Sequence, residues 1–439
     1  MVFLKNDSKY KKIVSTILIV FSIFNNDVAI TFGESVNKQP SIEGEYGIVM
    51  NMDTNEVLYS KNAFEKMYPA STTKMWTAYL TIKYAHDLNE YVTVKNDLSY
   101  VEPTSMYLKV GEKFTVEELL QSLMLNSSND VAVLLAEYIS GSVESFAELM
   151  NKEAKKIGCE NTNFVNPNGL PDENHYTTAY DIALMSSEAM KNDKLREIVQ
   201  LEYVKFYSNK IYNFDRVYRN SNKFISGKGT IEYKGEYINP KYDIVTGLKT
   251  GYTRAAGRCL LATAEKDGME IVSGVFKSQG DLVYTDSRTL IDYTYDNFQN
   301  NVILSKDDFS INKRIYFYKE KYVEGVIKDD YIVTVPKNEK LDNYSYEVKL
   351  NDKLNTPIQK DDIIGKVEIL KNKEIIDTID IYASQSIDSV FSINNKIIVV
   401  LAIWIIIFAI VFMLLRKKKY IKRIKVKKLK NTKNNIKLK

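Results

Sequence analysis

The chain has 439 residues, of which 45% are hydrophobic, and a formal net charge of +4. This length suffices for about two or three domains with sizeable hydrophobic cores. The positive charge is concentrated at the two ends and the segment between them is acidic, which excludes a nucleic-acid-binding protein.

The N-terminal residues are typical of an export signal. Four lysines precede an uncharged run from Ile13 to Phe24, which is too short to span a bilayer but fits the hydrophobic region of a secretory signal. We therefore predict a signal peptide over residues 1–33 and an exported chain. Because no clear small-residue cleavage site follows, an uncleaved N-terminal anchor stays open.

Two predicted strands, Tyr46–Met52 and Glu56–Ser60, lead to the first motif, Ser-Thr-Thr-Lys at residues 71–74. The apolar sequence after Ser71 predicts a buried helix that starts there. Lys74 lies on the same face one turn later, and an apolar wall makes its ammonium easier to deprotonate. We expect Ser71 to be a nucleophile and Lys74 its base, although Ser-x-x-Lys alone is a weak signal.

The second motif is Ser-Ser-Asn at residues 127–129. A capping box formed by Thr115 and Glu118 predicts a helix that ends in this polar cluster, and another helix follows it. Ser127 can therefore present a hydroxyl that relays a proton to the leaving amine, and Asn129 an amide that binds a substrate carbonyl. Two later helices are predicted at residues 146–157 and 178–190.

Lys249, Thr250 and Gly251 form the third motif, on a segment that approaches a strand. Lys249 can hold the hydroxyl of Ser127 and keep the cleft positive, and Thr250 can bind a terminal carboxylate. Gly251 leaves room for a peptide along the strand edge. The backbone N–H groups of Ser71 and Tyr252 would form an oxyanion hole.

The remaining elements predict the domain layout. Gly257–Ala264 and Met269–Phe276 form a predicted hairpin closed by Asp-Gly, and a helix at about 286–298 completes an α/β catalytic domain over residues 34–300. A small β-rich domain is predicted over 301–383, with strands at 314–318, 331–335 and 344–350.

The C-terminal region predicts a membrane attachment. After a polar linker at 384–396, residues 397–415 are uncharged and apolar, about 28 Å of helix, which matches the thickness of the hydrocarbon core. The basic tail at 416–439 is then expected in the cytoplasm and the rest of the chain outside, as a single-pass membrane protein.

Cysteine and histidine are rare. Cys159 and Cys259 lie in apolar sequence and predict two buried thiols, with one bridge between them left open. His86 and His175 belong to no metal-binding cluster, so we predict no metal and no cofactor.

Together the three motifs resemble those of the penicillin-binding serine hydrolases. The chain is most similar to the low-molecular-mass penicillin-binding proteins, the serine-type D-alanyl-D-alanine carboxypeptidases, over roughly residues 46–300. The resemblance extends to the segments 163–171, 175–181 and 249–259. It implies the penicillin-binding/β-lactamase-like transpeptidase fold, an α/β fold with a five-stranded antiparallel sheet and a helical subdomain.

This resemblance also implies a reaction. Ser71 would attack the carbonyl between the last two residues of a peptidoglycan stem pentapeptide ending in D-Ala-D-Ala, release D-Ala, and pass the acyl group to water. β-Lactam antibiotics would acylate Ser71 as inhibitors. Tyr252 departs from the family, whose members often have His there, which leaves substrate preference open. The arginine that binds the substrate carboxylate stays open among Arg254, Arg258 and Arg288.

Three alternatives share parts of this pattern. A serine β-lactamase has the same motifs, but we find no Glu-x-x-Leu-Asn sequence between Ser127 and Lys249. A peptidoglycan DD-endopeptidase or transpeptidase would differ only in its products. A non-catalytic wall-binding scaffold is the third alternative, and the presence of all the key polar residues argues against it.

Overall fold

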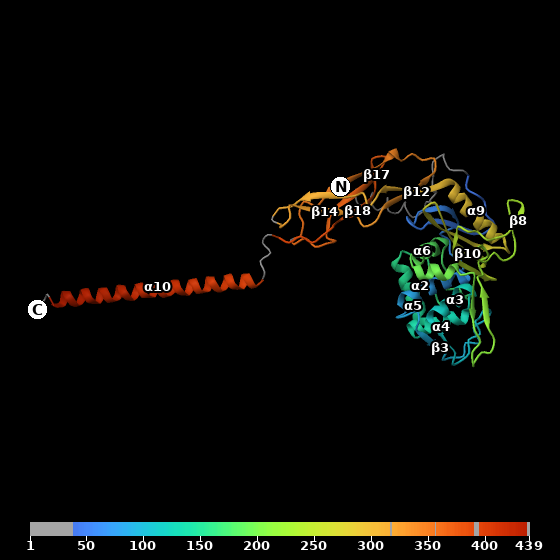
Figure 1. Cartoon of the computed structure of the whole chain (residues 1–439), viewed down its shortest axis with the longest axis horizontal. Helices are drawn as coiled ribbons and strands as arrows, with labels where there is room; N and C mark the ends of the chain where they lie inside the picture. Colours follow the sequence, from blue (N-terminus) through green and yellow to red (C-terminus); the bar gives the residue numbers. More distant parts are fainter. Residues whose placement is uncertain (1–37, 317, 356, 390–394, 437–439) are drawn as a thin grey trace, which may run out of the picture. The chain divides into compact units, whose positions relative to one another are not determined.

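The computed structural model describes residues 38–316, 318–355, 357–389 and 395–436 (Figure 1). The predicted signal peptide at 1–33 lies outside the described residues. Contacts divide the chain into two units, one that ends at Val302 and includes Ile332–Lys340, and one that holds Ile303–Tyr331 and the chain from Leu341 onward.

The first unit is built on a five-stranded antiparallel sheet with the strand order β2-β1-β11-β10-β9. Its strands are β1 (Tyr46–Asn51), β2 (Val57–Lys61), β9 (Val245–Thr253), β10 (Gly257–Lys266) and β11 (Met269–Ser278). Strands from the two ends of the domain pair directly, since β1 lies beside β11. This sheet is the one that the sequence resemblance implied. Asp267 and Gly268 close the β10–β11 hairpin with positive φ angles of 53° and 74°, as a type I′ turn requires.

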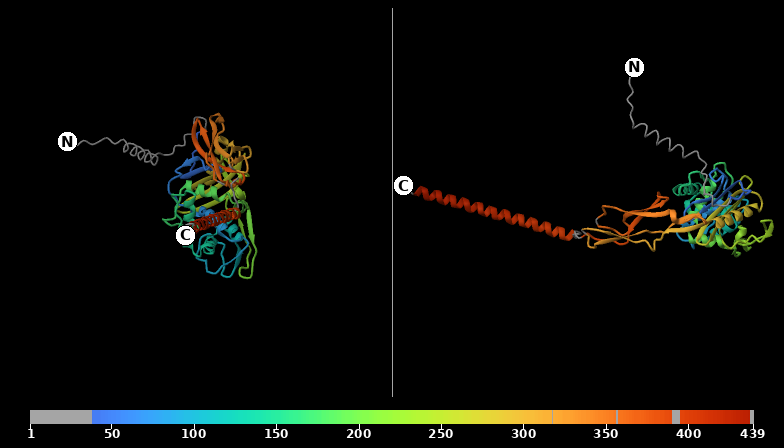
Figure 2. Two further views of the ribbon diagram at one scale, coloured as in Figure 1. Left: turned by 90° about the vertical axis from the view of Figure 1, so that its left-hand side faces the viewer. Right: turned by 90° about the horizontal axis from the view of Figure 1, so that it is seen from above.

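Helices cover both faces of this sheet (Figure 2). α9 packs on β10 and β11, and α6 packs on β1 and β11. The helical subdomain surrounds α2, whose Trp76 is buried and donates its indole N–H to Met150 O at 3.1 Å. The helices are α2 (Thr73–Tyr84), α3 (Val116–Leu125), α4 (Asn129–Ser140), α5 (Val143–Lys156), α6 (Ala179–Ala189), α7 (Asp193–Gln200), α8 (Lys223–Ser226) and α9 (Leu282–Asn297).

The predicted capping box of α3 is confirmed. Thr115 accepts a hydrogen bond from the backbone N–H of Glu118, whose carboxylate in turn accepts from the backbone N–H of Thr115. Two otherwise unpaired groups at the helix start are thereby satisfied. Three short hairpins complete the unit: β3 (Tyr91–Thr93) with β4 (Lys113–Thr115), β5 (Tyr203–Phe206) with β6 (Arg216–Arg219), and β7 (Ile231–Tyr233) with β8 (Glu236–Ile238).

The second unit contains a five-stranded sheet with the order β13-β14-β18-β17-β16 around a core that includes Val323, Val367 and Ile381. Its strands are β13 (Ile311–Arg314), β14 (Tyr322–Val326), β16 (Tyr344–Leu350), β17 (Ile363–Lys371) and β18 (Glu374–Ala383). β15 (Tyr331–Pro336) instead pairs with β12 (Phe298–Leu304).

One predicted strand in this unit, 314–318, is wrong. β13 ends at Arg314, and the backbone N–H of Ile315 already bonds to Lys321 O across the turn into β14. Alternating aromatic and charged residues fit a strand and a broad hairpin turn equally well, so the pattern misplaced the strand.

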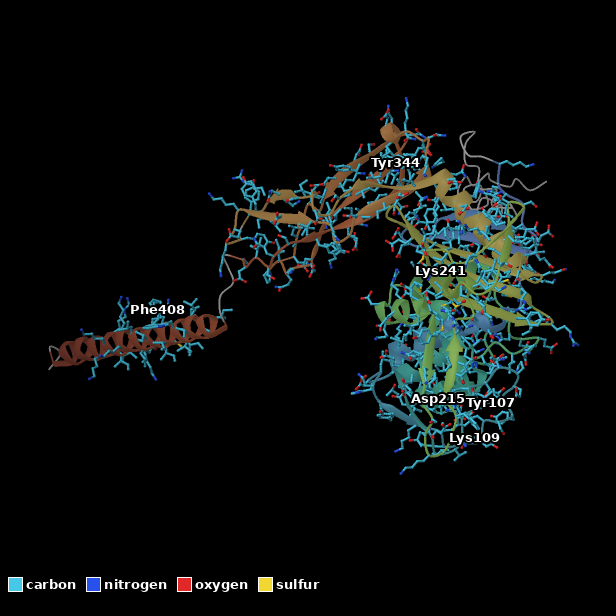
Figure 3. The ribbon with its side chains drawn as sticks, turned by 45° about the vertical axis from the view of Figure 1, so that its right-hand side comes forward. Tyr107, Lys109, Asp215, Lys241, Tyr344 and Phe408 are labelled. Atoms are coloured by element: carbon cyan, nitrogen blue, oxygen red, sulfur yellow. The ribbon has the colours of Figure 1, made fainter. Side chains whose placement is uncertain are left out.

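α10 (Asn395–Ile436) is a 42-residue helix. Its segment Val400–Lys425 contains an 18-residue window with a mean hydropathy of 2.5 and is long and apolar enough to cross a membrane. Large apolar side chains such as Phe408 are exposed on this helix (Figure 3). An apolar surface of this extent fits a membrane anchor.

Candidate active site

Ser71 and Lys74 meet at the start of α2. Ser71 lies in a 3-10 turn (Ala70–Thr72), so the helix begins two residues later than predicted. The Lys74 ammonium donates to Ser71 Oγ at 2.9 Å and to Asn168 O at 2.6 Å. These two hydrogen bonds fix the end of the Lys74 side chain, and the residue is 0% exposed. Lys74 is therefore placed to remove the hydroxyl proton of Ser71.

Burial and a second lysine both lower the pKa of Lys74. Burial lowers the pKa of Lys74 well below its ordinary value, and the charge of nearby Lys249 lowers it further. Lys249 is 1% exposed, and burial lowers its pKa to about 7. A lysine with a lowered pKa loses its proton more readily than an ordinary lysine, and only the neutral amine can act as a general base.

The third motif lies inside a strand and not before one. Lys249, Thr250 and Gly251 belong to edge strand β9, which contacts the turn that holds Ser71. A Cβ atom on Gly251 would lie 3.1 Å from Ser71 N, so glycine permits the strand to approach the nucleophile closely. The Thr250 hydroxyl shares a hydrogen bond with Ser221 Oγ at 2.7 Å.

Ser127 and Asn129 occupy the corner between α3 and α4, as predicted. Ser127 has a left-handed backbone with a φ of 66°. Within the described residues, Ser127 Oγ and Asn129 Oδ1 are buried without hydrogen-bond partners, and Lys249 Nζ donates to Thr250 O and not to Ser127. The expected Lys249–Ser127 contact is therefore absent from the described residues. Buried polar atoms without partners are unusual and here are available to a ligand.

Tyr252 and the candidate arginines differ in their surroundings. Tyr252 is 59% exposed, and the guanidinium of Arg258 lies 4.8 Å from the centre of its ring. Arg288 instead pairs with Asp292 on α9 and stacks on Tyr242. Of these two arginines, Arg258 is the one that lies next to a predicted site residue, and Arg254 stays a candidate.

The loop at 163–171 supplies contacts that sequence reasoning missed. Besides the bond from Lys74 to Asn168 O, the Thr77 hydroxyl donates to Pro167 O at 2.6 Å. Gly169 has a φ of 80°, and a Cβ atom there would lie 1.9 Å from Ala70 O. The dense Asn, Pro and Gly content indicates a turn, but any residue has a carbonyl, so no sequence pattern identifies Asn168.

His175 connects the start of α2 to the loop at 163–171. Its Nε2 lies 3.0 Å from Thr73 Oγ1, and its Nδ1 accepts the backbone N–H of Val165 at 3.2 Å. The Nε2 atom therefore carries the proton and donates to Thr73. Burial lowers the pKa of His175 to about 4, so this histidine stays neutral at physiological pH.

The two predicted buried thiols are confirmed. Cys159 and Cys259 are both buried and free. Burial raises the pKa of Cys259 to about 12, which keeps its thiol protonated and unreactive.

Comparison with known proteins agrees with this fold. Residues 34–280 match the family model described as D-alanyl-D-alanine carboxypeptidase, and residues 298–389 match the C-terminal domain of penicillin-binding protein 5. D-alanyl-D-alanine carboxypeptidase DacF of Bacillus subtilis is 29% identical over 374 residues, which cover 83% of this chain and 92% of DacF. A D-alanyl-D-alanine carboxypeptidase of Streptomyces K15 is 32% identical over 55% of this chain and 82% of its own.

Solved structures show the same architecture. Penicillin-binding protein 5 of Haemophilus influenzae has a TM-score of 0.64 and 25% identity, covering 80% of this chain and all of that one. The Streptomyces K15 DD-transpeptidase has a TM-score of 0.54 and 28% identity over 59% of this chain and all of its own.

The chain therefore belongs to the D-alanyl-D-alanine carboxypeptidase family, whose model matches more than half of it. More particularly, it is a serine-type carboxypeptidase, a hydrolase related to the low-molecular-mass penicillin-binding proteins.

Replacing Gly169 by alanine tests whether the loop at 163–171 positions the nucleophile. The new Cβ would collide with Ala70 O and displace the Ser71 turn. We expect kcat/KM for D-Ala release to fall by about 100-fold, since catalysis is this sensitive to a shift of about 1 Å.

Gly141→Ala is the matched control. Gly141 has a φ of 83°, but nothing lies within 4 Å of the position that an added Cβ would take, so alanine there adds only backbone strain of about 1 kcal/mol. We expect this variant to lose some thermal stability and to keep its kcat/KM. Equal activity of the two variants would show that Gly169 does not position Ser71.

Proposed function

We propose that this protein is a membrane-anchored carboxypeptidase that removes the terminal D-Ala from peptidoglycan stem pentapeptides through a Ser71 acyl-enzyme. The observation that carries this proposal is the 2.9 Å hydrogen bond between Ser71 Oγ and a buried Lys74 whose pKa is well below its ordinary value. The names of the related proteins, D-alanyl-D-alanine carboxypeptidases, support the choice of substrate.

In the acylation step, Lys74 takes the Ser71 hydroxyl proton as Oγ attacks the carbonyl carbon between the two D-Ala residues. The negative charge that develops on the carbonyl oxygen is held by the backbone N–H groups of Ser71 and Tyr252. As the C–N bond breaks, Ser127 passes a proton to the departing amine and is reprotonated from Lys74. D-Ala leaves and the acyl group remains as an ester on Ser71.

Deacylation returns the enzyme to its starting state. Water attacks the ester carbonyl, its proton goes to Lys74, and the Ser71 oxygen recovers a proton as the ester bond breaks. Asn129 binds the amide of the acyl chain in both steps, whereas Lys249 and Thr250 bind the carboxylate of the terminal D-Ala before it leaves. Gly251 leaves the β9 edge open to the peptide backbone.

β-Lactam antibiotics are proposed to acylate the same serine. Ser71 would attack the strained lactam carbonyl as it attacks the peptide carbonyl, and the C–N bond of the ring would break. Because the amine is part of the opened ring, it stays attached to the acyl-enzyme and does not leave the site. The orphaned oxygens of Ser127 and Asn129 supply polar partners for either ligand.

The composition of the N-terminal and C-terminal segments supports a proposed location for the enzyme. We propose a signal peptide at 1–33, a catalytic domain at 34–300, a β-rich domain at 301–383, a linker at 384–396, a membrane helix at 397–415 and a cytoplasmic tail at 416–439. The apolar surface of α10 and the basic residues after it support this arrangement. The catalytic domain would then face the cell wall.

Incubating the full-length protein in detergent with a labelled penicillin and a D-Ala-D-Ala pentapeptide tests the activity. We expect one covalent penicillin per chain on the peptide that contains Ser71, and release of one D-Ala per pentapeptide. Ser71→Ala should lose both, because no other group supplies the nucleophile.

The products separate the alternatives. Rapid release of hydrolysed penicillin would indicate a β-lactamase, and cleavage of crosslinked dimers without D-Ala release would indicate an endopeptidase. If the wild-type protein neither forms the adduct nor releases D-Ala, the proposed function is wrong and a wall-binding scaffold is favoured.

Topology is tested separately by cysteine labelling of intact cells. A single cysteine introduced at Ser384 should react with a membrane-impermeant maleimide, and one introduced at Asn431 should react only after the cells are opened. The native Cys159 and Cys259 are buried and give the background signal. The reverse labelling pattern would reject the proposed orientation.

A further inference from the structure

Eleven residues other than glycine have positive φ angles in the described part of the chain. Eight of them are Asn, Asp or Lys, and the other three are Ala70, Ser127 and Tyr107. Ala70 precedes the nucleophile, and Ser127 belongs to the second motif. Strained backbone of this kind persists only where the surroundings enforce it, and it concentrates at functional sites. Tyr107, with a φ of 59°, is the bulkiest of the three.

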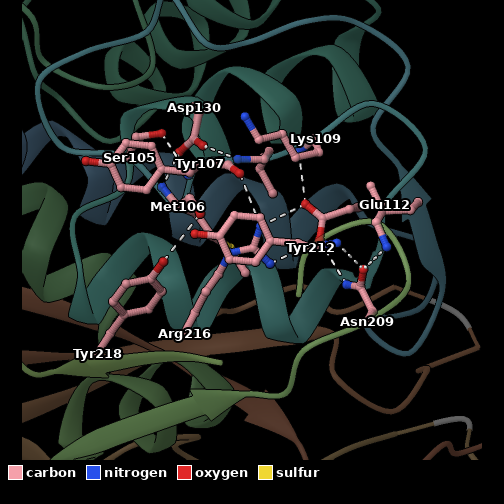
Figure 4. Close-up of polar contacts among 12 residues, drawn as sticks. Ser105, Met106, Tyr107, Lys109, Glu112, Asp130, Asn209, Tyr212, Arg216 and Tyr218 are labelled. Carbon is pink, nitrogen blue, oxygen red and sulfur yellow. Dashed lines mark hydrogen bonds and ion pairs between the residues drawn. The ribbon is translucent and has the colours of Figure 1, made fainter. Parts of the chain in front are cut away.

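A set of hydrogen bonds holds the Tyr107 backbone in this conformation (Figure 4). The Asp130 carboxylate accepts the backbone N–H groups of Met106 at 2.9 Å and of Leu108 at 3.1 Å, on either side of Tyr107. The Tyr107 N–H donates to Ser105 Oγ at 2.9 Å, and Tyr107 O accepts from Arg216 at 3.1 Å. Each of these four backbone contacts is made by a side chain.

The arginine in this set is itself fixed. Arg216 forms two hydrogen bonds with the carboxylate of Glu112, at 3.0 Å and 2.8 Å, and both side chains are buried. Asn209 donates to the same carboxylate at 2.9 Å, and the Tyr212 ring lies 3.7 Å from the guanidinium (Figure 4). A buried, bidentate pair of this geometry is rigid. The contacts that support Tyr107 therefore extend to β6, which carries Arg216 and pairs with β5.

The backbone held in this way leaves the Tyr107 ring exposed to solvent. Met106 and Leu108 are buried, whereas Tyr107 is 54% exposed. Burial of its own ring therefore contributes little to offset the strain at Tyr107. A simple surface turn would be satisfied by glycine or asparagine at this position.

The turn lies against the second motif. Asn129 donates its backbone N–H to Thr104 O at 2.7 Å, and Asn126 donates its side chain to Ser105 O at 3.3 Å. Asp130, which holds Tyr107, directly follows Asn129 in α4. Tyr107 therefore lies in the loop that packs against the corner between α3 and α4, which carries Ser127 and Asn129.

We propose that the Tyr107 ring is a specificity-determining contact for the acyl part of the stem peptide, which would lie between this ring and the β9 edge. This inference rests on the proposed function. A phenol ring offers a flat apolar face to peptide groups and aliphatic side chains at a small cost in conformational entropy. A peptide that extends past the D-Ala-D-Ala end reaches the ring, whereas a capped dipeptide does not.

The test compares two substrates, a stem pentapeptide and N-acetyl-D-Ala-D-Ala, with the full-length enzyme and its variants in detergent. For Tyr107→Ala we expect an about tenfold lower kcat/KM on the pentapeptide through a raised KM, with kcat kept, because the contact is made equally before and during the reaction. On the dipeptide we expect a change of no more than about twofold. Tyr107→Phe should behave like the wild type.

Tyr107→Gly separates the ring from the backbone. Glycine adopts this φ without strain, so the melting temperature of this variant should not fall below that of the wild type, while the pentapeptide kcat/KM should fall as in Tyr107→Ala. Tyr91→Ala is the matched control. Tyr91 is 66% exposed, but it lies on β3 and outside the loop that carries Tyr107. The control should change the kinetics of neither substrate.

Three outcomes would overturn the inference. The pentapeptide kcat/KM of Tyr107→Gly could equal that of the wild type, or both substrates could lose activity equally, or the loss could follow a lower melting temperature. A wild-type enzyme that releases no D-Ala from either substrate would overturn the proposed function as well. An active wild type with unaffected Tyr107 variants would overturn this inference alone.

Discussion

The site depends on keeping two lysine side chains out of water. Lys74 and Lys249 are both buried, and neither forms an ion pair with a carboxylate among the described residues. Burial disfavours the charged form of each, and the charge of Lys249 adds to the effect on Lys74. The negative charge of Asp130 opposes these effects on Lys74, but burial is the largest of them, so the fold shifts Lys74 toward the neutral form that a general base requires.

Holding this pair requires three separate parts of the first unit. Helix α2 carries Lys74, the edge strand β9 carries Lys249, and the loop at 163–171 covers Lys74 through Asn168 O. Their close approach depends on two glycines. Gly169 lies against the carbonyl of Ala70, and Gly251 lies against the backbone of Ser71. The glycines therefore set the distance between the nucleophile and the elements that surround it.

Much of this architecture is predictable because it is encoded locally. Asp267 and Gly268 identify their hairpin through the φ angles that the turn requires, and Thr115 and Glu118 identify the start of α3. The Ser71–Lys74 contact spans one turn, so its spacing suffices to predict it. These features depend on residues that are neighbours in the sequence.

The parts that could not be predicted depend on tertiary contacts. Asn168 acts through its backbone carbonyl, which every residue has, and Tyr107 is distinguished by a φ angle that its residue type does not indicate. The bond from Lys249 to Thr250 O, in place of the one expected to Ser127, depends on tertiary packing that the sequence does not specify. The sequence predicted which groups react, but not the tertiary contacts that support them.

The pH dependence of the acylation rate constant with a labelled penicillin tests the central claim most directly. A base with a lowered pKa is neutral above that pKa, so the rate should rise with pH through an acidic limb far below the ordinary lysine value of 10.5 and be maintained at neutral pH. Lys249→Met removes the neighbouring charge in a similar volume and should move this limb to higher pH. A wild-type limb near pH 10.5 would show that Lys74 is charged at neutral pH and would contradict the account.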